Sequence, residues 1–309
     1  MFNYFKFFNN LLIVSIIIGL LLVVFLVFRM KVDYYRQIVR YRRIPDFTRW
    51  ILSDKYIAKR YAEINGFSVP ETYQLVKYPH NIDFSKLDFK KGFVIKPTDL
   101  CSSKGVYLIK DGRDLFNGGE FNKEEMIKEL NGIRCKIGNE YFMHDLMFGG
   151  LVPFSGLIVE ELLLDDEGMV PVDYKCYAFQ GRVYLIAMTY NRRFKDGKQE
   201  FDSVWLTRDW RPIRIPMKKE NYKYRKSVGD QRIPEYSEMI RLVEAVSKKL
   251  ERHCRIDVYC IGGKVYLGEF TFFCGARIHT AICNLILGVI WMMKPDNYLV
   301  CDERIMGLI

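Results

Sequence analysis

The stretch Arg255–Phe272, RIDVYCIGGKVYLGEFTF, has two short apolar runs separated by Gly262-Gly263, a pattern typical of a β-hairpin. Each run carries one carboxylate, Asp257 in the first and Glu269 in the second, where a buried strand usually has a β-branched residue. A carboxylate is costly to bury without a partner. The hairpin therefore raises the question of what these two acids face.

The length of the turn decides whether the two acids share a face. If Gly262 and Gly263 form a two-residue turn, the alternation of the strands puts the acids on opposite faces. If the loop has three residues, with a bulge beside Gly263, Asp257 and Glu269 share a face with Thr271. That arrangement favours a hard cation, Mg²⁺ or Mn²⁺, which in turn holds phosphates. The alternative is that the acids are separate, with one of them facing solvent.

The N-terminal region contains a strongly apolar run. Leu11 to Phe28, LLIVSIIIGLLLVVFLVF, has eighteen residues and no charge. As a helix it would extend about 27 Å, close to the thickness of the hydrocarbon core of a bilayer. Arg29, Met30 and Lys31 follow directly, with no small-residue cleavage site, which favours an uncleaved anchor over a signal peptide. We therefore predict a short N-terminal tail at 1–10 and a transmembrane helix at 11–28.

The charge after this run predicts which side of the membrane the domain occupies. The chain has a formal net charge of +10, and residues 29–43 alone hold six Arg/Lys against one Asp. This local excess places the main domain in the cytoplasm of a single-pass membrane protein. It also favours anionic lipid headgroups as the partner of residues 29–43, and argues against a nucleic acid. We expect residues 29–50 to form a basic juxtamembrane helix.

Two further segments suggest nucleotide binding. Lys96 ends one apolar run, and a loop with Ser102, Ser103 and Gly105 leads to the next; such a loop can enclose a polyphosphate while the lysine supplies charge. An ordinary hairpin turn is the alternative. In IVEELLLDDEG, residues 158–168, a strand that ends beside apolar leucines can bracket a purine, and Glu167 can bind ribose hydroxyls. A buried strand followed by a solvated acidic turn is the alternative.

The remaining periodicity predicts an α+β fold with antiparallel hairpins. A helix capped by Ser53 or Asp54 runs to about Ile64, and Gly66 ends it. Residues 172–190 form a second hairpin about Gln180-Gly181, and residues 234–251 have a helical apolar stripe. The eight cysteines show no CxxC pair and are interpreted as reduced. The apolar run 281–293, AICNLILGVIWMM, is too short to span a membrane and is expected to be core or interfacial.

The order of these features resembles the ATP-grasp superfamily, and is most similar to its TupA-like polysaccharide-biosynthesis branch. The resemblance runs from about Ser53 to Arg277 and is most specific in RIDVY and GKVYLGEFTF. It implies an α+β ATP-grasp fold, with two subdomains gripping ATP behind the transmembrane helix. In this division, residues 51–90 are the lead-in, residues 91–155 the subdomain with the phosphate loop, and residues 156–309 the subdomain with the adenine strand and metal site.

The resemblance also implies roles for individual residues. Contacts to ATP would come from Lys55, Lys96, Ser102, Ser103, Glu167 and the strand residues Glu160, Glu161, Leu162 and Leu163. Lys175 and Arg192 would face the γ-phosphate or the acyl-phosphate. Asp257, Glu269 and Thr271 would bind Mg²⁺, with Mn²⁺ as an alternative. Two departures stand out: Thr271 occupies a position where many relatives carry Asn, and the loop DLCSSKG replaces a His-Gly-Ser-Gly-type loop.

The function implied is an ATP-dependent carboxylate–amine ligase that acts through an acyl-phosphate. No nucleophilic side chain is needed, and the four histidines form no obvious triad. The anchor would suit a substrate on a cell-surface polysaccharide, such as a capsule, or on its lipid-linked precursor. Two alternatives remain: a metal-dependent glycosyltransferase that uses the acidic turn DDEG, and a non-catalytic ATP-grasp-like scaffold.

Overall fold

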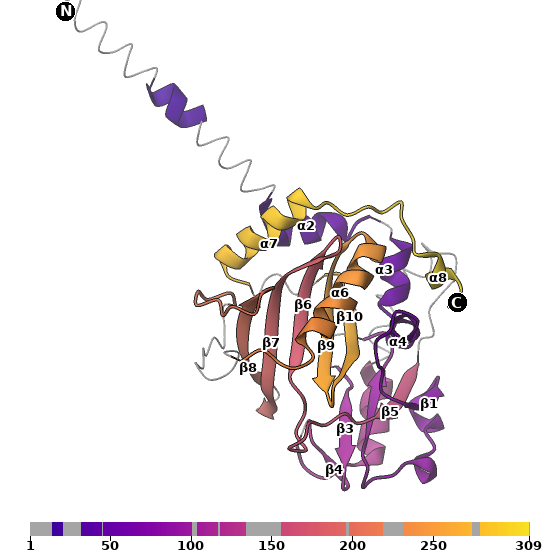
Figure 1. The fold of residues 1–309 in the computed structure, drawn as a ribbon. Coiled ribbons are helices and arrows are strands. Elements are labelled where there is room, and N and C mark those ends of the chain that lie inside the picture. The colour runs from indigo at the N-terminus through magenta and orange to yellow at the C-terminus, as the bar shows by residue number, and fades with distance from the viewer. Residues whose placement is uncertain are drawn as a thin grey trace, which may run out of the picture.

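Two five-stranded antiparallel sheets organise the chain (Figure 1). The computed structural model describes residues 14–20, 32–44, 46–100, 104–116, 118–133, 156–195, 198–218, 231–273 and 279–308. The first sheet has the order β1-β5-β2-β3-β4, with strands β1 (Thr72–Val76), β5 (Leu157–Glu161), β2 (Phe93–Pro97), β3 (Tyr107–Lys110) and β4 (Arg113–Asp114). The second has the order β10-β9-β6-β7-β8, with strands β10 (Lys264–Thr271), β9 (His253–Ile261), β6 (Asp173–Phe179), β7 (Arg182–Lys195) and β8 (Lys198–Thr207). The α+β class and the predicted hairpins are confirmed.

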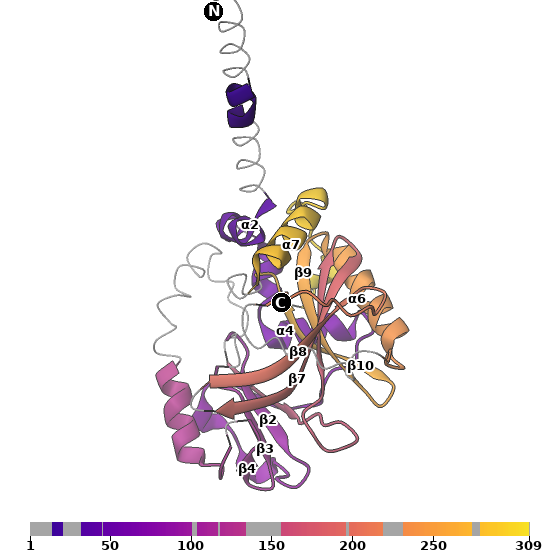
Figure 2. The same cartoon turned by 90° about the vertical axis from the view of Figure 1, so that its left-hand side faces the viewer.

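The first sheet is buried on one face by a helix at residues 123–133 (Figure 2). Ile95 and Val159 alternate inward and pack with Met126 and Leu130 of this helix. Their neighbours in the sequence point to the opposite face, which carries the charged side chains Lys96 and Glu160 and a small apolar cluster of Leu108, Phe116 and Leu162. Strand β5 belongs to this first sheet, although the division predicted from the sequence placed residues 156–309 in the second subdomain. The 3₁₀ turns η1 (Pro79–Asn81) and η2 (Phe84–Lys86) lie in the connection from β1 to β2.

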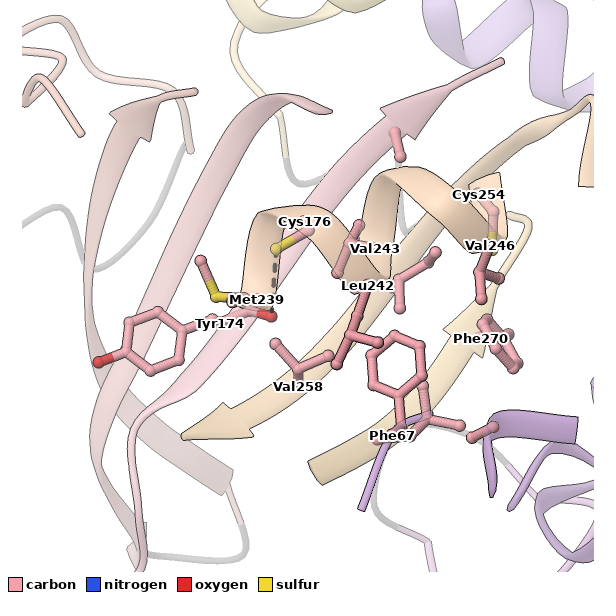
Figure 3. Packing of buried hydrophobic residues seen from close by; sticks show 14 of the residues in the cluster. Phe67, Tyr174, Cys176, Met239, Leu242, Val243, Val246, Cys254, Val258 and Phe270 are labelled. Carbon is pink, nitrogen blue, oxygen red and sulfur yellow. Dashed lines mark hydrogen bonds between the residues drawn. The ribbon is translucent and has the colours of Figure 1, made fainter. Parts of the chain in front are cut away.

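The second sheet has helix α6 (Tyr236–Leu250) on one face. Figure 3 shows Met239, Leu242 and Val243 of the helix lying near Cys176 and Val258 of the strands, within the largest buried cluster. Because side chains alternate along a strand, the apolar positions of β9 that face α6 leave Arg255, Asp257 and Tyr259 on the opposite face. The helix thus fixes which side of the sheet carries the acids.

Helices α2 (Tyr34–Tyr41) and α7 (Ala281–Met293) cover one end of that opposite face (Figures 1 and 2). Tyr34 and Trp291 are fully buried there, and pack with Phe179 of the sheet. The hydroxyl of Tyr34 lies 2.8 Å from Nε2 of His253. The short helices α3 (Phe47–Leu52), α4 (Lys55–Glu63) and α8 (Glu303–Met306) complete the domain.

The hairpin that carries the acids differs from both expected forms. Ile261 pairs with Lys264, so the turn has two residues, and both of its glycines have positive φ (55° and 76°). The predicted three-residue loop is therefore wrong. The register shifts instead between Leu267 and Glu269, so that Glu269 lies directly opposite Asp257. A bulge at Gly268, and not the turn, puts the two acids on one face.

The bulge requires a glycine. A Cβ at Gly268 would lie 3.1 Å from the carbonyl oxygen of Asp257 and 3.1 Å from Cε2 of Tyr259. Both neighbours are held by the sheet, so a side chain at this position would push β10 away from β9. The absence of a side chain at Gly268 therefore allows the bulge that sets Glu269 opposite Asp257.

The basic segment differs from the predicted juxtamembrane helix. Residues 29–50 do not form one helix: α2 ends at Tyr41, and Asp46 caps a separate helix, α3, by accepting from the backbone N–H of Arg49. Val32, Tyr34 and Ile38 are buried in the domain. The segment is thus part of the folded core on one side, and only its other side is exposed.

The structure describes residues 14–20 of the predicted transmembrane segment, and they are helical. In the described part of the chain, no helix has the length and apolar character needed to cross a bilayer. The other residues of 11–28 lie outside the described ranges.

Candidate active site

The first element of the site is the start of α4, which follows the sequence prediction. Asp54 caps this helix by accepting from the backbone N–H groups of Tyr56 and Ile57. The backbone N–H of Lys55 donates to the carbonyl oxygen of Thr98 at 2.7 Å, just beyond the end of β2. Lys55 Nζ donates to the carbonyl oxygen of Leu100. The helix start is therefore docked on the strand that carries Lys96, which brings the two predicted phosphate-binding lysines into one region.

A buried carboxylate lies beside these lysines. Glu160, on β5, forms ion pairs with Lys96 of β2 and with Lys59 of α4, the latter at 3.3 Å. Its side chain is 4 % exposed. Lys59 also donates to Oγ1 of Thr72 at 2.7 Å. Burial lowers the pKa of Lys59, and the attraction of Glu160 opposes that shift. The lysines at this site are thus held in place before any ligand binds.

The second element is a row of charged residues across three strands. Lys175 of β6 pairs with Asp257 of β9, and Asp257 pairs with Glu269 of β10. Lys175 Nζ donates to Asp257 at 2.8 Å and to Asp173 at 2.5 Å. Arg255 binds Asp257 through two hydrogen bonds, both 2.6 Å long. The sheet thus brings together the predicted Lys175, Asp257 and Glu269.

Electrostatics links the two sheets at Lys55. Burial lowers the pKa of Lys55; the charge of Glu269 acts to raise it, and that of Lys96 to lower it. Lys55 therefore lies within electrostatic range of both Glu269, in the second sheet, and Lys96, in the first. A polyphosphate near Lys55 would be close to both the lysine region and the acidic row.

Asp257 is held in its charged form. Burial alone would raise its pKa, but Arg255 and Lys175 together hold the pKa below its usual value. Its carboxylate is therefore an anion at neutral pH, as a metal ligand must be. In the described state, however, both of its oxygens accept hydrogen bonds from cationic side chains.

The donor set fits Mg²⁺ in type. Asp257 and Glu269 are hard oxygen donors that face each other across two strands. Among the described residues, no three acidic, histidine or cysteine side chains are arranged so that they could hold a metal ion together, so a cation here would need phosphate oxygens or water to complete its shell. Thr271 Oγ1 donates to Glu269 at 2.7 Å and accepts from Arg255 at 3.1 Å. The predicted third ligand is thus placed beside Glu269 and orients its carboxylate.

The predicted adenine strand is β5 together with the residues that follow it. The backbone N–H of Glu161 donates to the carbonyl oxygen of Glu71, the residue before β1, so that donor is occupied. Leu162 is buried in the apolar cluster with Leu108, and Leu163 is half-buried. An apolar surface next to the charged residues of this face is therefore present, as an adenine site requires.

The other predicted contacts are described only in part. Glu167 is exposed in a turn in which its backbone N–H donates to Asp165 at 3.1 Å. Arg192 lies in β7, and its side chain is not among those described. Ser102 and Ser103 lie outside the described residues. The roles of these residues stay predictions.

Sequence reasoning missed two residues of the site, Lys59 and Arg255. Both had a readable signal. Lys59 follows Lys55 by four positions, which places both lysines on one face of a helix. Arg255 precedes Asp257 by two positions, which places both on one face of a strand. In each case the missing information was the partner, which comes from a distant part of the chain.

The two sheets, with the lysine pair and the facing carboxylates, have the arrangement of the ATP-grasp fold, and a comparison with protein families agrees. Residues 36–284 match the family described as TupA-like ATPgrasp. The match covers most of the chain, so the protein belongs to the TupA-like ATP-grasp family. No curated protein matches the sequence.

Solved structures of two ligases and a synthetase are similar at low identity. D-alanine–D-alanine ligase from Bacillus anthracis, complexed with ATP, is 17 % identical, with 73 % of this chain and 57 % of that chain covered and a TM-score of 0.38. The corresponding ligase from Helicobacter pylori is 15 % identical, with coverages of 84 % and 69 % and a TM-score of 0.41. D-cycloserine synthetase is 16 % identical, with coverages of 83 % and 71 % and a TM-score of 0.42. The chain thus spans little more than half the length of the Bacillus anthracis ligase.

Proposed function

We propose that the protein is an ATP-dependent carboxylate–amine ligase that acts through an acyl-phosphate. The observation that carries the proposal is the bulge at Gly268, which sets Asp257 and Glu269 opposite each other beside Lys175. Lys55 also supports the proposal, because the charges of both Glu269 and Lys96 act on its pKa. The family assignment supports the same reading over the glycosyltransferase alternative.

The reaction has two steps. A substrate carboxylate attacks the γ-phosphorus of ATP, which forms an acyl-phosphate and releases ADP. An amine then attacks the acyl carbon, and phosphate leaves as the amide forms. The barrier to phosphoryl transfer is lowered mainly by positioning and by electrostatic stabilisation, so no nucleophilic side chain is required.

Each part of the site has a role in this proposal. Lys55 and Lys96 bind the ATP phosphates, and the backbone at the end of the segment 160–163, at Leu162 and Leu163, binds adenine, with Glu167 on the ribose. Ser102 and Ser103 belong to the loop over the phosphates. Lys175 and Arg192 stabilise charge on the transferred phosphoryl group. Asp257 and Glu269, with Thr271 beside them, would hold Mg²⁺ or Mn²⁺, which supplies positive charge against the phosphate oxygens.

The membrane association is a further part of the proposal. The eighteen uncharged residues at 11–28 would anchor the chain as a single-pass protein with its catalytic domain in the cytoplasm. The basic residues of 29–43 would contact anionic headgroups. An enzyme held in this way is suited to an acid or amine carried by a cell-surface polysaccharide or by its lipid-linked precursor.

The direct test is ADP release by the full chain in detergent, with Mg²⁺, across a panel of amino acids and uronic-acid glycans. We expect release to depend on one acid and one amine together, and to be lost in Asp257→Asn and in Glu269→Gln. Unchanged turnover in both variants would refute the ligase proposal.

One observation favours a second candidate, a non-catalytic nucleotide-binding scaffold. Both oxygens of Asp257 accept hydrogen bonds from Arg255, and one also accepts from Lys175, so a cation must displace these bonds to bind. Binding of Mg²⁺–ATP at one site per chain, without ADP release for any pair in the panel, would support the scaffold.

A further inference from the structure

The outer side of α7 is an exposed apolar surface. The helix has thirteen residues and not one charged side chain. Its inner side, with Cys283, Leu287 and Trp291, is buried against the second sheet. Its outer side includes Leu285, which is 46 % exposed, and Met293, which is 70 % exposed. Helices on a protein surface normally carry polar residues on the outer side, so this one differs from the expected pattern.

Helix α2 places basic residues beside this surface. Gly288 of α7 is in such close contact with the start of α2 that an added Cβ would lie 1.5 Å from the carbonyl oxygen of Val32. The side-chain amide of Gln37 also donates to the carbonyl oxygen of Gly288 at 2.8 Å. Four arginines of α2 and of the turn that follows it, namely Arg36, Arg40, Arg42 and Arg43, are exposed. Because α2 and α7 are in direct contact, we treat these arginines and the outer side chains of α7 as one region, which we call the α2–α7 surface.

The α2–α7 surface is also locked to the domain beneath it. Tyr34 contacts His253, Trp291 stacks on His253 with ring centres 4.6 Å apart, and Tyr41 stacks on Trp291 at 4.9 Å. Burial lowers the pKa of His253 to about 3, so the ring is neutral at physiological pH. The surface thus cannot move without the strand that carries the acids.

We propose that the α2–α7 surface docks on an anionic bilayer, with the outer side chains of α7 at the boundary of headgroups and acyl chains. An apolar helix face next to a cluster of arginines has the chemistry of an interfacial helix. At about 1.5 Å per residue, α7 is roughly 20 Å long, which is too short to span the hydrocarbon core. The uncharged run that ends at Phe28 precedes Tyr34 by only a few residues, so the chain enters the domain at this surface.

Docking would fix how far the acidic row lies from the membrane. Asp257 follows His253 by four residues on the same strand, a distance of about 13 Å, and α7 lies over His253. A group carried on a lipid would have to extend past α7 and along this stretch of β9 to reach the reaction centre. This consequence rests on the proposed ligase function, whereas the docking itself does not.

The test uses the full chain in lipid nanodiscs that contain phosphatidylglycerol with brominated acyl chains, which quench tryptophan fluorescence only at short range. We expect the tryptophan fluorescence of a Leu285→Trp variant to be quenched more strongly than that of the unmodified protein. A Met169→Trp variant, at an exposed turn beside the first sheet, should show no additional quenching. Equal quenching of both variants, or none in either, would overturn the proposal.

A charge variant separates the contribution of the arginines. Adding Arg36→Gln, Arg40→Gln and Arg43→Gln to Leu285→Trp should reduce its quenching; Arg42 is kept because it lies over the ring of Phe273. The matched control, Lys248→Gln and Lys249→Gln on α6 with Lys264→Gln on β10, also removes three positive charges and should leave the quenching unchanged. An equal loss of quenching in the arginine variant and in the lysine control would contradict a specific contact of these arginines with the headgroups. Because no arm involves ATP, failure of the ligase proposal would not affect these results.

Discussion

The two sheets hold their charged residues in opposite ways. On the first sheet one buried carboxylate, Glu160, is shared by Lys59 and Lys96, with Lys55 close by, so positive charge is in excess. On the second sheet itself, the described side chains of this row are three carboxylates, Asp173, Asp257 and Glu269, and two cations, Lys175 and Arg255, so negative charge is in excess. A polyphosphate suits the first and a divalent cation suits the second. The same kind of arrangement, a buried ion-pair network, thus preorganises one sheet for an anionic ligand and the other for a cationic one.

The largest loss of ATP turnover is expected when the acids of the second sheet are neutralised. Asp257→Asn and Glu269→Gln should each reduce ATP turnover by about 10²-fold or more, because charge on the phosphoryl group would lose its stabilisation. The measurement is steady-state ADP release, with a melting curve to show that each variant is folded. Glu238→Gln, which removes an exposed acid on α6 that pairs with Arg241, is the matched control and should keep full turnover.

The register of the acids is tested at Gly268. Gly268→Ala should lower the free energy of unfolding by about 1–3 kcal/mol, because the new methyl group overpacks against Asp257 and Tyr259. Turnover should fall as well, since Glu269 would move relative to Asp257. Chemical denaturation and ADP release measure the two effects. Gly132→Ala adds a methyl group with nothing within 4 Å in a helix and should be stabilising or neutral; a Gly268→Ala variant that behaves like it would contradict the role of the bulge.

The first sheet is tested by removing one of its two cations. Lys59→Met leaves Glu160 buried with Lys96 as its remaining ion-pair partner, and should lower the free energy of unfolding by about 1–3 kcal/mol. We expect KM for ATP to rise, with a smaller change in kcat than in the Asp257 variant. Adding Glu160→Gln to Lys59→Met should recover part of the lost stability, a coupling that a double-mutant cycle measures. Independent, additive losses would mean that the pair is not coupled.

The smallest effect on turnover is expected at Asp54, which caps α4. Burial raises the pKa of Asp54 from 3.8 to about 6, so the folded state binds this proton more tightly than the unfolded state. The free energy of unfolding should therefore fall as the pH rises between these two values, by about 1–3 kcal/mol, and be constant above them. Asp54→Asn keeps the cap and removes this fall, which denaturation at several pH values would reveal. The same pH dependence in both proteins would show that other groups cause it.

Much of the local structure could be read from the sequence, because it depends on neighbouring residues. Asp54 as a cap and Gly66, with φ of 87°, as the end of the helix determine the boundaries of α4. Apolar alternation marked β2, β3, β6 and β9, and the spacing of apolar residues marked α6. The candidate residues Lys96, Asp257 and Glu269 were also found in this way, whereas Lys55 and Lys175 came from the family resemblance.

Register, burial and ion pairing depend on contacts between distant segments of the chain. The sequence determined that two acids occur on neighbouring strands, but not that a bulge at Gly268 would bring them opposite each other, since strand register is set by pairing along the whole hairpin. It showed that residues 29–50 are basic, but not that Tyr34 and Ile38 would be buried against α7. Nor did it show that the segment would form two helices, α2 and α3, in place of one. It contained Lys59 and Arg255, but not their partners Glu160 and Asp257. Periodicity is a local property of the chain, whereas register, burial and ion pairing arise only when remote strands and helices meet.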